Sequence, residues 1–295
     1  MSGTQRRLFC FGLGYTAGRL ARDLSADGWT VAGTCQTAAR QAEWTAQGIE
    51  AFVFDEESPL ADALAALAGT THLLSSVPPV DGGDPVLMGH GGDIQALGGV
   101  QWAGYLSSTG VYGDTGGATV DERSPVKPTS ERTRRRAEAE ARWLALAKDH
   151  GLPVHVFRLA GIYGPGRSTL DLMRADGARR IEKPGHLFSR IHVDDIVTVL
   201  KASMSRPDPG AIYNVSDDEP AATADVTQFA CKILGTAPPP AIPFEEAEKE
   251  MSPMALSFWR DNRRVDNTRI KEELGVALAY PNYRAGLQAL LVAGR

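Results

Sequence analysis

The stretch YLSSTGVYGD at residues 105–114 carries three consecutive hydroxyl side chains, Ser107, Ser108 and Thr109, at the end of an apolar run. An apolar run of this length bounded by turn residues is typical of a buried strand, which would deliver the hydroxyls to the edge of a sheet. Residues of this kind predict an active site, so a group that gives or takes a proton is expected nearby.

A second motif, FCFGLGYTAGRLA, contains the fingerprint G-x-G-x-x-G/A at Gly12, Gly14 and Ala17. It follows an expected strand and opens an expected helix, which is the context that dinucleotide binding requires. The first glycine permits a tight turn, the second lets the backbone approach a pyrophosphate, and Ala17 or Gly18 allows close packing. The N–H groups at the helix start, around Tyr15 and Thr16, would hold the anion.

The expected second strand ends in VAGTCQTAAR, which lacks the acid that usually binds the ribose hydroxyls of NAD. Thr34, Gln36, Thr37 and Arg40 could instead surround a 2′-phosphate, because guanidinium and hydroxyl groups are phosphate donors. The expected cofactor is therefore NAD(P), with NADP slightly preferred. Asp55, after the third strand, could bind an adenine amine or simply cap its loop.

The elements that position these motifs alternate between β-branched apolar runs and longer segments of helical period. That alternation predicts a parallel sheet covered by helices. Strands are expected at 7–11, 30–34, 50–54, 72–76, 102–108, 153–159 and 211–215, with helices such as 16–28 and 38–48 between them.

Composition narrows the choice of partner. The chain has 295 residues, 43% hydrophobic and 23% charged, with a formal net charge of -5. This charge gives no field suited to nucleic acid, so a small-molecule substrate is expected. Three scattered cysteines predict neither a disulfide framework nor a metal site, and point to a reducing cytoplasm. The N-terminus is expected to be neither a signal peptide nor a membrane span, and neither nucleic acid nor a membrane is an expected partner.

Taken in order, the glycine loop, FVFD, LLSSVPP, YLSSTGVYGD, FRLAGIYGPGR, RIHVDDI, IYNVSDDEP and LGVALAYPNYRAGLQAL resemble the extended short-chain dehydrogenase/reductases, the NAD-dependent epimerase/dehydratase group. The chain is most similar to an atypical branch of that superfamily. The resemblance covers nearly the whole chain. It implies that Ser108 polarises a substrate carbonyl, and that Ser75, Ser76 and Val77 pass the ribose and phosphates of the cofactor.

The resemblance also implies a helix bearing Tyr-x-x-x-Lys, in which the tyrosine is the general acid or base. Alignment on Pro128 and the trailing AEAE puts Arg132 at the tyrosine position and Arg136 at the lysine position. Arginine does not shuttle protons at neutral pH. Arg136 could still supply a fixed positive charge, or Arg134 and Arg136 could simply pair with Glu138 and Glu140 on a solvated face.

A replacement for the tyrosine must come from elsewhere. Tyr112 and Tyr163 follow strands and are candidates, although both could be packing residues. His192 is another, although it also fits a helix entry in which Asp194 or Asp195 provides the N-terminal cap. Candidate anion contacts for the substrate are Arg167, Arg190, Arg263 and Arg264.

The sequence thus predicts an α/β protein with a Rossmann-type doubly wound parallel sheet and a smaller C-terminal substrate lobe. Residues 1–160, with 191–215 returning, form the dinucleotide-binding domain; 161–190 and 216–295 form the lobe. The predicted function is NAD(P)-linked oxidation, reduction or epimerisation of a small, possibly anionic hydroxyl or carbonyl compound by a monomer or homodimer. The alternative is a non-catalytic dinucleotide-binding regulatory or interaction protein.

Overall fold

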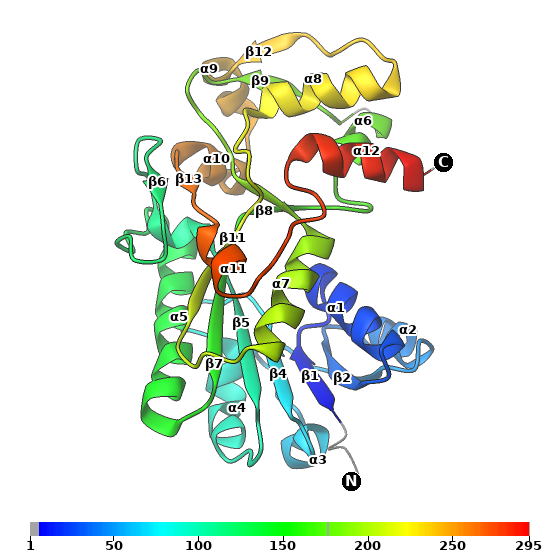
Figure 1. The fold of residues 1–295 in the computed structure, drawn as a ribbon, viewed down its shortest axis with the longest axis vertical. Coiled ribbons are helices and arrows are strands. Elements are labelled where there is room, and N and C mark those ends of the chain that lie inside the picture. The colour runs from blue at the N-terminus through cyan, green and yellow to red at the C-terminus, as the bar shows by residue number, and fades with distance from the viewer. Residues whose placement is uncertain (1–5, 176, 295) are drawn as a thin grey trace. The chain divides into compact units, whose positions relative to one another are not determined.

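A seven-stranded sheet, with strands between Arg7 and Val215, organises the fold (Figure 1). The computed structural model describes residues 6–175 and 177–294. The strand order is β11-β7-β5-β4-β1-β2-β3. The strands are β1 (Arg7–Phe11), β2 (Thr30–Cys35), β3 (Glu50–Val53), β4 (His72–Ser75), β5 (Trp102–Ser108), β7 (Val154–Leu159) and β11 (Ile212–Val215).

The sheet has the doubly wound arrangement expected from the sequence. Strand β1 pairs in parallel with β2 on one side and with β4 on the other, so the chain reverses its direction of travel across the sheet at β1. The adjoining pairs β2–β3 and β4–β5 are parallel as well. A parallel sheet is covered on both faces, which explains why β4 and β7 are buried along their whole length. The Rossmann-type α/β prediction is confirmed.

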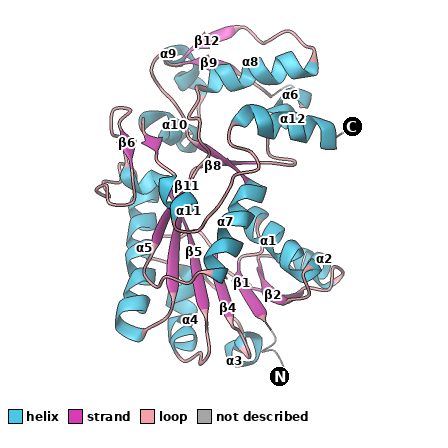
Figure 2. Ribbon diagram, viewed as in Figure 1, coloured by secondary structure: helices cyan, strands magenta, loops and turns pink. Residues whose placement is uncertain are grey.

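Helices connect successive strands and flank the sheet (Figure 2). Asp84 caps α4 through bonds from the Val86 and Leu87 N–H groups and also accepts a bond from Trp143 Nε1, which ties α4 to α5. The helices are α1 (Tyr15–Ala26), α2 (Ala38–Thr45), α3 (Ala63–Leu67), α4 (Pro85–Gln95), α5 (Glu131–His150) and α7 (Val193–Ser205).

The chain divides into two compact units. Unit 1 runs to Ser107 and includes Arg134–Arg158 and Leu200–Tyr213. Its core contains Phe9, Phe11 and Tyr105 from the sheet and Trp143 from α5. The domain limits at residues 160, 190 and 215 stay predictions.

Unit 2 comprises Ser108–Thr133, Leu159–Val199 and the chain from Asn214 onward. Leu170, Val226 and Leu287 join α6, α8 and α12 in one cluster, and Phe244 and Trp259 lie in a second. Its further elements are η1 (Thr109–Tyr112), β6 (Thr119–Val120), β8 (Gly161–Tyr163), α6 (Thr169–Arg174), β9 (Arg180–Glu182), β10 (Arg190–His192), α8 (Thr223–Leu234), β12 (Ala241–Pro243), α9 (Phe244–Ala247), η2 (Glu248–Glu250), α10 (Pro253–Arg260), β13 (Arg264–Val265), α11 (Thr268–Glu272) and α12 (Tyr283–Ala293).

None of the helices within 6–175 and 177–294 is long and apolar enough to cross a membrane. The same residues contain no group of three or more histidine, cysteine, aspartate or glutamate side chains that could hold a metal ion.

Candidate functional site

The turn after β1 forms around Gly12, which has a φ of 87° and therefore lies in the region that glycine favours. Its N–H donates to Thr34 Oγ1 at 2.8 Å, and its carbonyl accepts from Ser76 Oγ at 2.6 Å. A Cβ on Gly12 would lie 2.9 Å from Ser76 Oγ. The first glycine of the fingerprint is therefore required by the fold itself.

Gly14 differs from Gly12 because it faces open space. A Cβ built on Gly14 would meet no atom within 4 Å, and α1 begins at the next residue without a side-chain cap. No side chain caps this helix start, and the helix dipole favours an anion there. Gly18 has a packing role, since a Cβ there would lie 2.8 Å from the Trp44 ring of α2.

Gly12 and Gly14 border a cavity of about 540 Å³ in unit 1. Nine residues that the sequence marks as cofactor candidates line it: Gly12, Gly14, Thr34, Gln36, Thr37, Arg40, Asp55, Ser76 and Val77. Cys35 lines it as well. Tyr15, Thr16, Ala17 and Ser75 do not line it. Thr16, Ala17 and Ser75 are buried, whereas Tyr15 is 36% exposed.

Polar groups around this cavity already have partners. Asp55 Oδ1 accepts the N–H groups of Glu57 and Ser58 at 2.9 and 2.8 Å, so the loop-capping role of Asp55 is present in the structure. Arg40 pairs with Glu43 across one helical turn, and its guanidinium lies 5.8 Å from the centre of the Trp44 ring. Half of the Arg40 side chain is exposed, which leaves it accessible to a phosphate.

The Cys35 thiol was missed by the sequence reasoning. It is buried and donates toward the carbonyls of Thr37 and Phe52, and burial raises its pKa. The signal for Cys35 was its place at the end of β2, because the carboxyl ends of parallel strands line the ligand crevice of such sheets.

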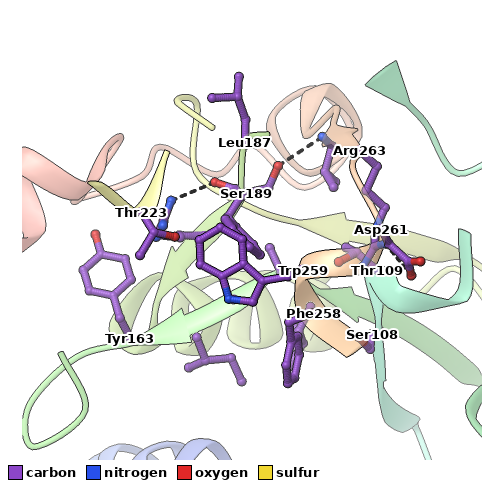
Figure 3. A pocket seen from close by; sticks show the side chains of 17 residues that line it. Ser108, Thr109, Tyr163, Leu187, Ser189, Thr223, Phe258, Trp259, Asp261 and Arg263 are labelled. Atoms are coloured by element: carbon purple, nitrogen blue, oxygen red, sulfur yellow. Dashed lines mark hydrogen bonds and ion pairs between the residues drawn. The ribbon is translucent and has the colours of Figure 1, made fainter. Parts of the chain in front are cut away.

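A second cavity, of about 360 Å³, lies in unit 2 (Figure 3). Figure 3 shows Ser108, Thr109 and Arg263 grouped on one side and Tyr163 on the other. Ser108 Oγ accepts the Gly110 N–H at 3.1 Å, which leaves its own O–H as a donor toward a ligand. Burial raises the pKa of Tyr163, so this phenol stays protonated at neutral pH.

The two other candidates for the proton donor are placed differently. Tyr112 is 1% exposed, and its hydroxyl donates to Asn214 Oδ1 at 2.7 Å. His192 is equally buried, and its Nδ1 accepts the Asp194 N–H at 3.2 Å where α7 begins. Neither residue lines the cavity of unit 2. Their positions correspond to packing for Tyr112 and to a helix start for His192.

One capping expectation needs correction. The Asp195 carboxylate accepts the N–H groups of Ala279 and Tyr280 at 2.7 and 3.0 Å, so it fixes a distant segment rather than the start of its own helix. These bonds leave no local sequence pattern, because the carboxylate and the two backbone N–H groups are 84 and 85 residues apart.

Of the two alternatives for Arg136, the pairing with Glu140 on a solvated face is wrong. Glu140 is buried and binds Arg158 of β7 and the Ser107 hydroxyl, the latter at 2.8 Å. Arg136 instead donates through Nη1 to the Tyr105 hydroxyl at 3.1 Å and to the Leu106 carbonyl at 3.0 Å. Its predicted catalytic charge stays a prediction.

Comparison with known proteins agrees with this architecture. Residues 55–216 match the NAD dependent epimerase/dehydratase family. A structure from Silicibacter pomeroyi DSS, described as a functionally unknown conserved protein, is 50% identical, covers 98% of this chain and 99% of its own, and has a TM-score of 0.90. Protein YeeZ of Escherichia coli K12 is 29% identical over 94% of this chain and 97% of its own length.

More distant structures share the fold. The dTDP-glucose 4,6-dehydratase of Bacillus anthracis, solved in complex with NAD, is 15% identical with a TM-score of 0.76, covering 98% of this chain and 96% of its own. The fold and the glycine loop define a Rossmann-type protein. Because the family match spans more than half of the chain, the protein belongs to the NAD dependent epimerase/dehydratase family.

Proposed function

We propose that the protein is an NAD(P)-linked oxidoreductase or epimerase acting on a small hydroxyl or carbonyl compound. The observation that carries this proposal is the cavity of unit 1, where Gly12, Gly14 and Ser76 surround open space at the start of α1. That geometry suits a pyrophosphate. When bound, a nicotinamide accepts or supplies a hydride.

NADP is the preferred cofactor in this proposal. Cys35, Gln36 and Thr37 line the cavity at the end of β2, and none of them is acidic. This turn therefore lacks the carboxylate that binds the ribose hydroxyls in typical NAD sites. Arg40 lies beside these three residues and can bind a 2′-phosphate with part of its guanidinium while Glu43 holds the rest.

The substrate would occupy the cavity of unit 2. Ser108 donates its hydroxyl proton to the reacting oxygen. Tyr163 of β8 also lines the cavity, and its protonated hydroxyl donates to the Asn282 carbonyl at 3.5 Å. A buried phenol of raised pKa is a hydrogen-bond donor rather than a base.

Calorimetric titration of the full chain with NADP and NAD at matched salt tests the cofactor. The Gly14→Asp variant should lose at least about 100-fold in affinity, because its carboxylate occupies the phosphate position without clashing with the fold. Gly92→Asp is the matched control, since a Cβ on that α4 glycine also meets nothing within 4 Å. The proposal would be overturned if neither NADP nor NAD bound.

A second candidate function is a dinucleotide-binding regulatory or interaction protein without turnover. The observation that favours it is the sequence of α5, ERTRRRAEAEARWLALAKDH, in which Arg132 and Arg136 stand at the positions aligned with tyrosine and lysine. Ser108→Ala separates the two functions. It should abolish turnover by an enzyme while NADP affinity is kept, whereas a regulator has no turnover to lose.

A further inference from the structure

Arg190 differs from the other arginine of the unit 2 cavity in its electrostatic partners. Arg263 pairs with the Asp261 carboxylate at 3.2 Å and donates to the Gly113 carbonyl. Arg190 donates through Nη1 to the carbonyls of Phe188 and Ala221, both at 2.8 Å. Within residues 6–175 and 177–294, no carboxylate lies within ion-pair distance of Arg190.

The acid with the largest electrostatic effect on Arg190 is Asp217, and it does not neutralise the guanidinium. Asp217 is 2% exposed, and burial raises its pKa to about 8. It therefore carries its proton through most of the neutral range. Arg190 is itself half-buried, and burial lowers its pKa, which shows the cost of keeping this charge away from water. A half-buried charge of this kind calls for a counter-ion from outside the chain.

The wall of the cavity beside this charge is aromatic. Figure 3 shows Phe258 and Trp259 of α10 at the cavity. Arg190 lines the same cavity. Trp259 packs edge-on against Phe188, whereas Phe258 stays 49% exposed. The Arg132 guanidinium lies over the Phe258 ring at 4.6 Å. An accessible ring in a cavity is a contact surface for an apolar or aromatic group.

We propose that the unit 2 cavity binds a compound in which a carboxylate or phosphate is joined to an apolar ring, with Arg190 at the anion and Phe258 at the ring. A guanidinium binds either oxyanion through paired N–H donors, and Nε and Nη2 of Arg190 have no protein acceptor among the described residues. The inference rests on the proposed function in taking this cavity as the substrate site.

Calorimetry of the full chain with three probes tests the pairing of anion and ring. The probes are benzoate, phenyl phosphate and the neutral benzyl alcohol. At least one of the two anions should bind, and benzyl alcohol should bind at least tenfold more weakly. Stronger binding of benzoate assigns a carboxylate substrate, and stronger binding of phenyl phosphate assigns a phosphate. Binding of neither anion, or equal binding of benzyl alcohol, overturns the proposal.

Variants locate the site. Arg190→Met should lower the affinity for the anion at least tenfold, whereas Arg190→Lys, which keeps the charge, should lower this affinity less. Phe258→Ala should reduce the affinity of both anions, and Arg180→Met is the control because that residue pairs with Glu182 on β9, outside the cavity. Melting temperatures confirm that each variant is folded. Unchanged anion affinity in Arg190→Met refutes the assignment.

The two proposals fail in distinguishable ways. A protein that binds NADP but neither anion refutes only the assignment of Arg190. A protein that binds an anion through Arg190 but neither dinucleotide refutes the proposed function.

Discussion

The two cavities that the candidate site residues line are built in opposite ways. In unit 1, the lining residues come from the turns after consecutive strands, and all fall between Gly12 and Pro85. In unit 2, the lining comes from segments spread from Ser108 to Val265, on η1, β8, β10 and α10 among others. A local strand-turn-helix pattern therefore specifies the first cavity, and distant chain segments specify the second.

The two cavities also differ in the kind of chemical group that each presents to a ligand. The unit 1 cavity uses backbone N–H groups and glycines, whose positions follow from one turn. The unit 2 cavity uses charged and aromatic side chains, and their roles depend on partners such as Asp261 for Arg263. The same residue type, arginine, is neutralised at one position and left with an unmatched charge at another.

The largest effect is expected at a buried network of unit 1. Glu140→Ala leaves Arg158 as a buried charge without its carboxylate and removes the acceptor of Ser107. Breaking such a pair costs about 3–5 kcal/mol. Urea unfolding should show this loss, whereas Glu138→Ala, on the exposed face of the same helix, should cost less than about 0.5 kcal/mol. Equal effects would mean that Glu140 is not structurally distinct.

A glycine of α12 probes the packing behind the unit 2 cavity. A Cβ on Gly286 would lie 2.1 Å from the Tyr163 hydroxyl, so Gly286→Ala forces Tyr163 to shift. The expected loss is about 1–3 kcal/mol of stability, as for other overpacked sites. Gly91→Ala in α4 meets no atom within 4 Å and should instead stabilise unit 1 by up to about 1 kcal/mol. A neutral or stabilising Gly286→Ala would contradict the packing.

Asp217 predicts a pH dependence of stability. Its pKa is raised from 3.8 to about 8, so between these values the folded state holds a proton that the unfolded state has released. Stability should therefore fall as pH rises, by up to about 1.4 kcal/mol per pH unit from this group. Denaturation curves from pH 5 to about 8 should show a shallower fall in Asp217→Asn than in the parent protein.

The control for this measurement is Asp225→Asn, an exposed residue of α8. Its pH profile should follow that of the parent protein. An identical profile for Asp217→Asn would show that Asp217 is ionised in the folded state.

The smallest effect concerns cofactor choice in unit 1. Arg40→Ala should lower the preference for NADP over NAD by about tenfold, since one exposed charge-assisted contact contributes about 1 to 1.5 kcal/mol. Calorimetric affinities for both dinucleotides measure the ratio. If the ratio is unchanged, Arg40 does not bind the 2′-phosphate.

Much of the fold was predictable because its signals are local. The expected strand 7–11 coincides with β1 and 102–108 with β5, and the remaining strand limits differ by one residue at most. Apolar runs of strand length bounded by glycines and polar turns are sufficient for this. The family assignment followed from the ordered motifs and is confirmed by the match over residues 55–216.

The side-chain environments were less predictable. Spacing placed Glu140 four residues after Arg136, which favoured a surface pair, but β7 brings Arg158 to the same carboxylate inside the core. Tyr112 lies shortly after a strand, where a catalytic residue could stand. Its hydroxyl nevertheless donates to Asn214, which is 102 residues further along the chain. Hydrophobic periodicity predicts which face of a helix is buried, but it does not predict which polar group a buried side chain binds.

The sequence by itself therefore determined the alternation of strands and helices, the glycine turn and the family, because strand formation and helix starts follow local patterns. Only the tertiary structure decided which charges are neutralised. Arg263 and Arg190 look equivalent as letters in the sequence, but a carboxylate reaches one and only a protonated acid lies near the other. The strength of an electrostatic interaction depends on the distance between the charges and on their burial. The spacing of residues along the chain determines neither quantity.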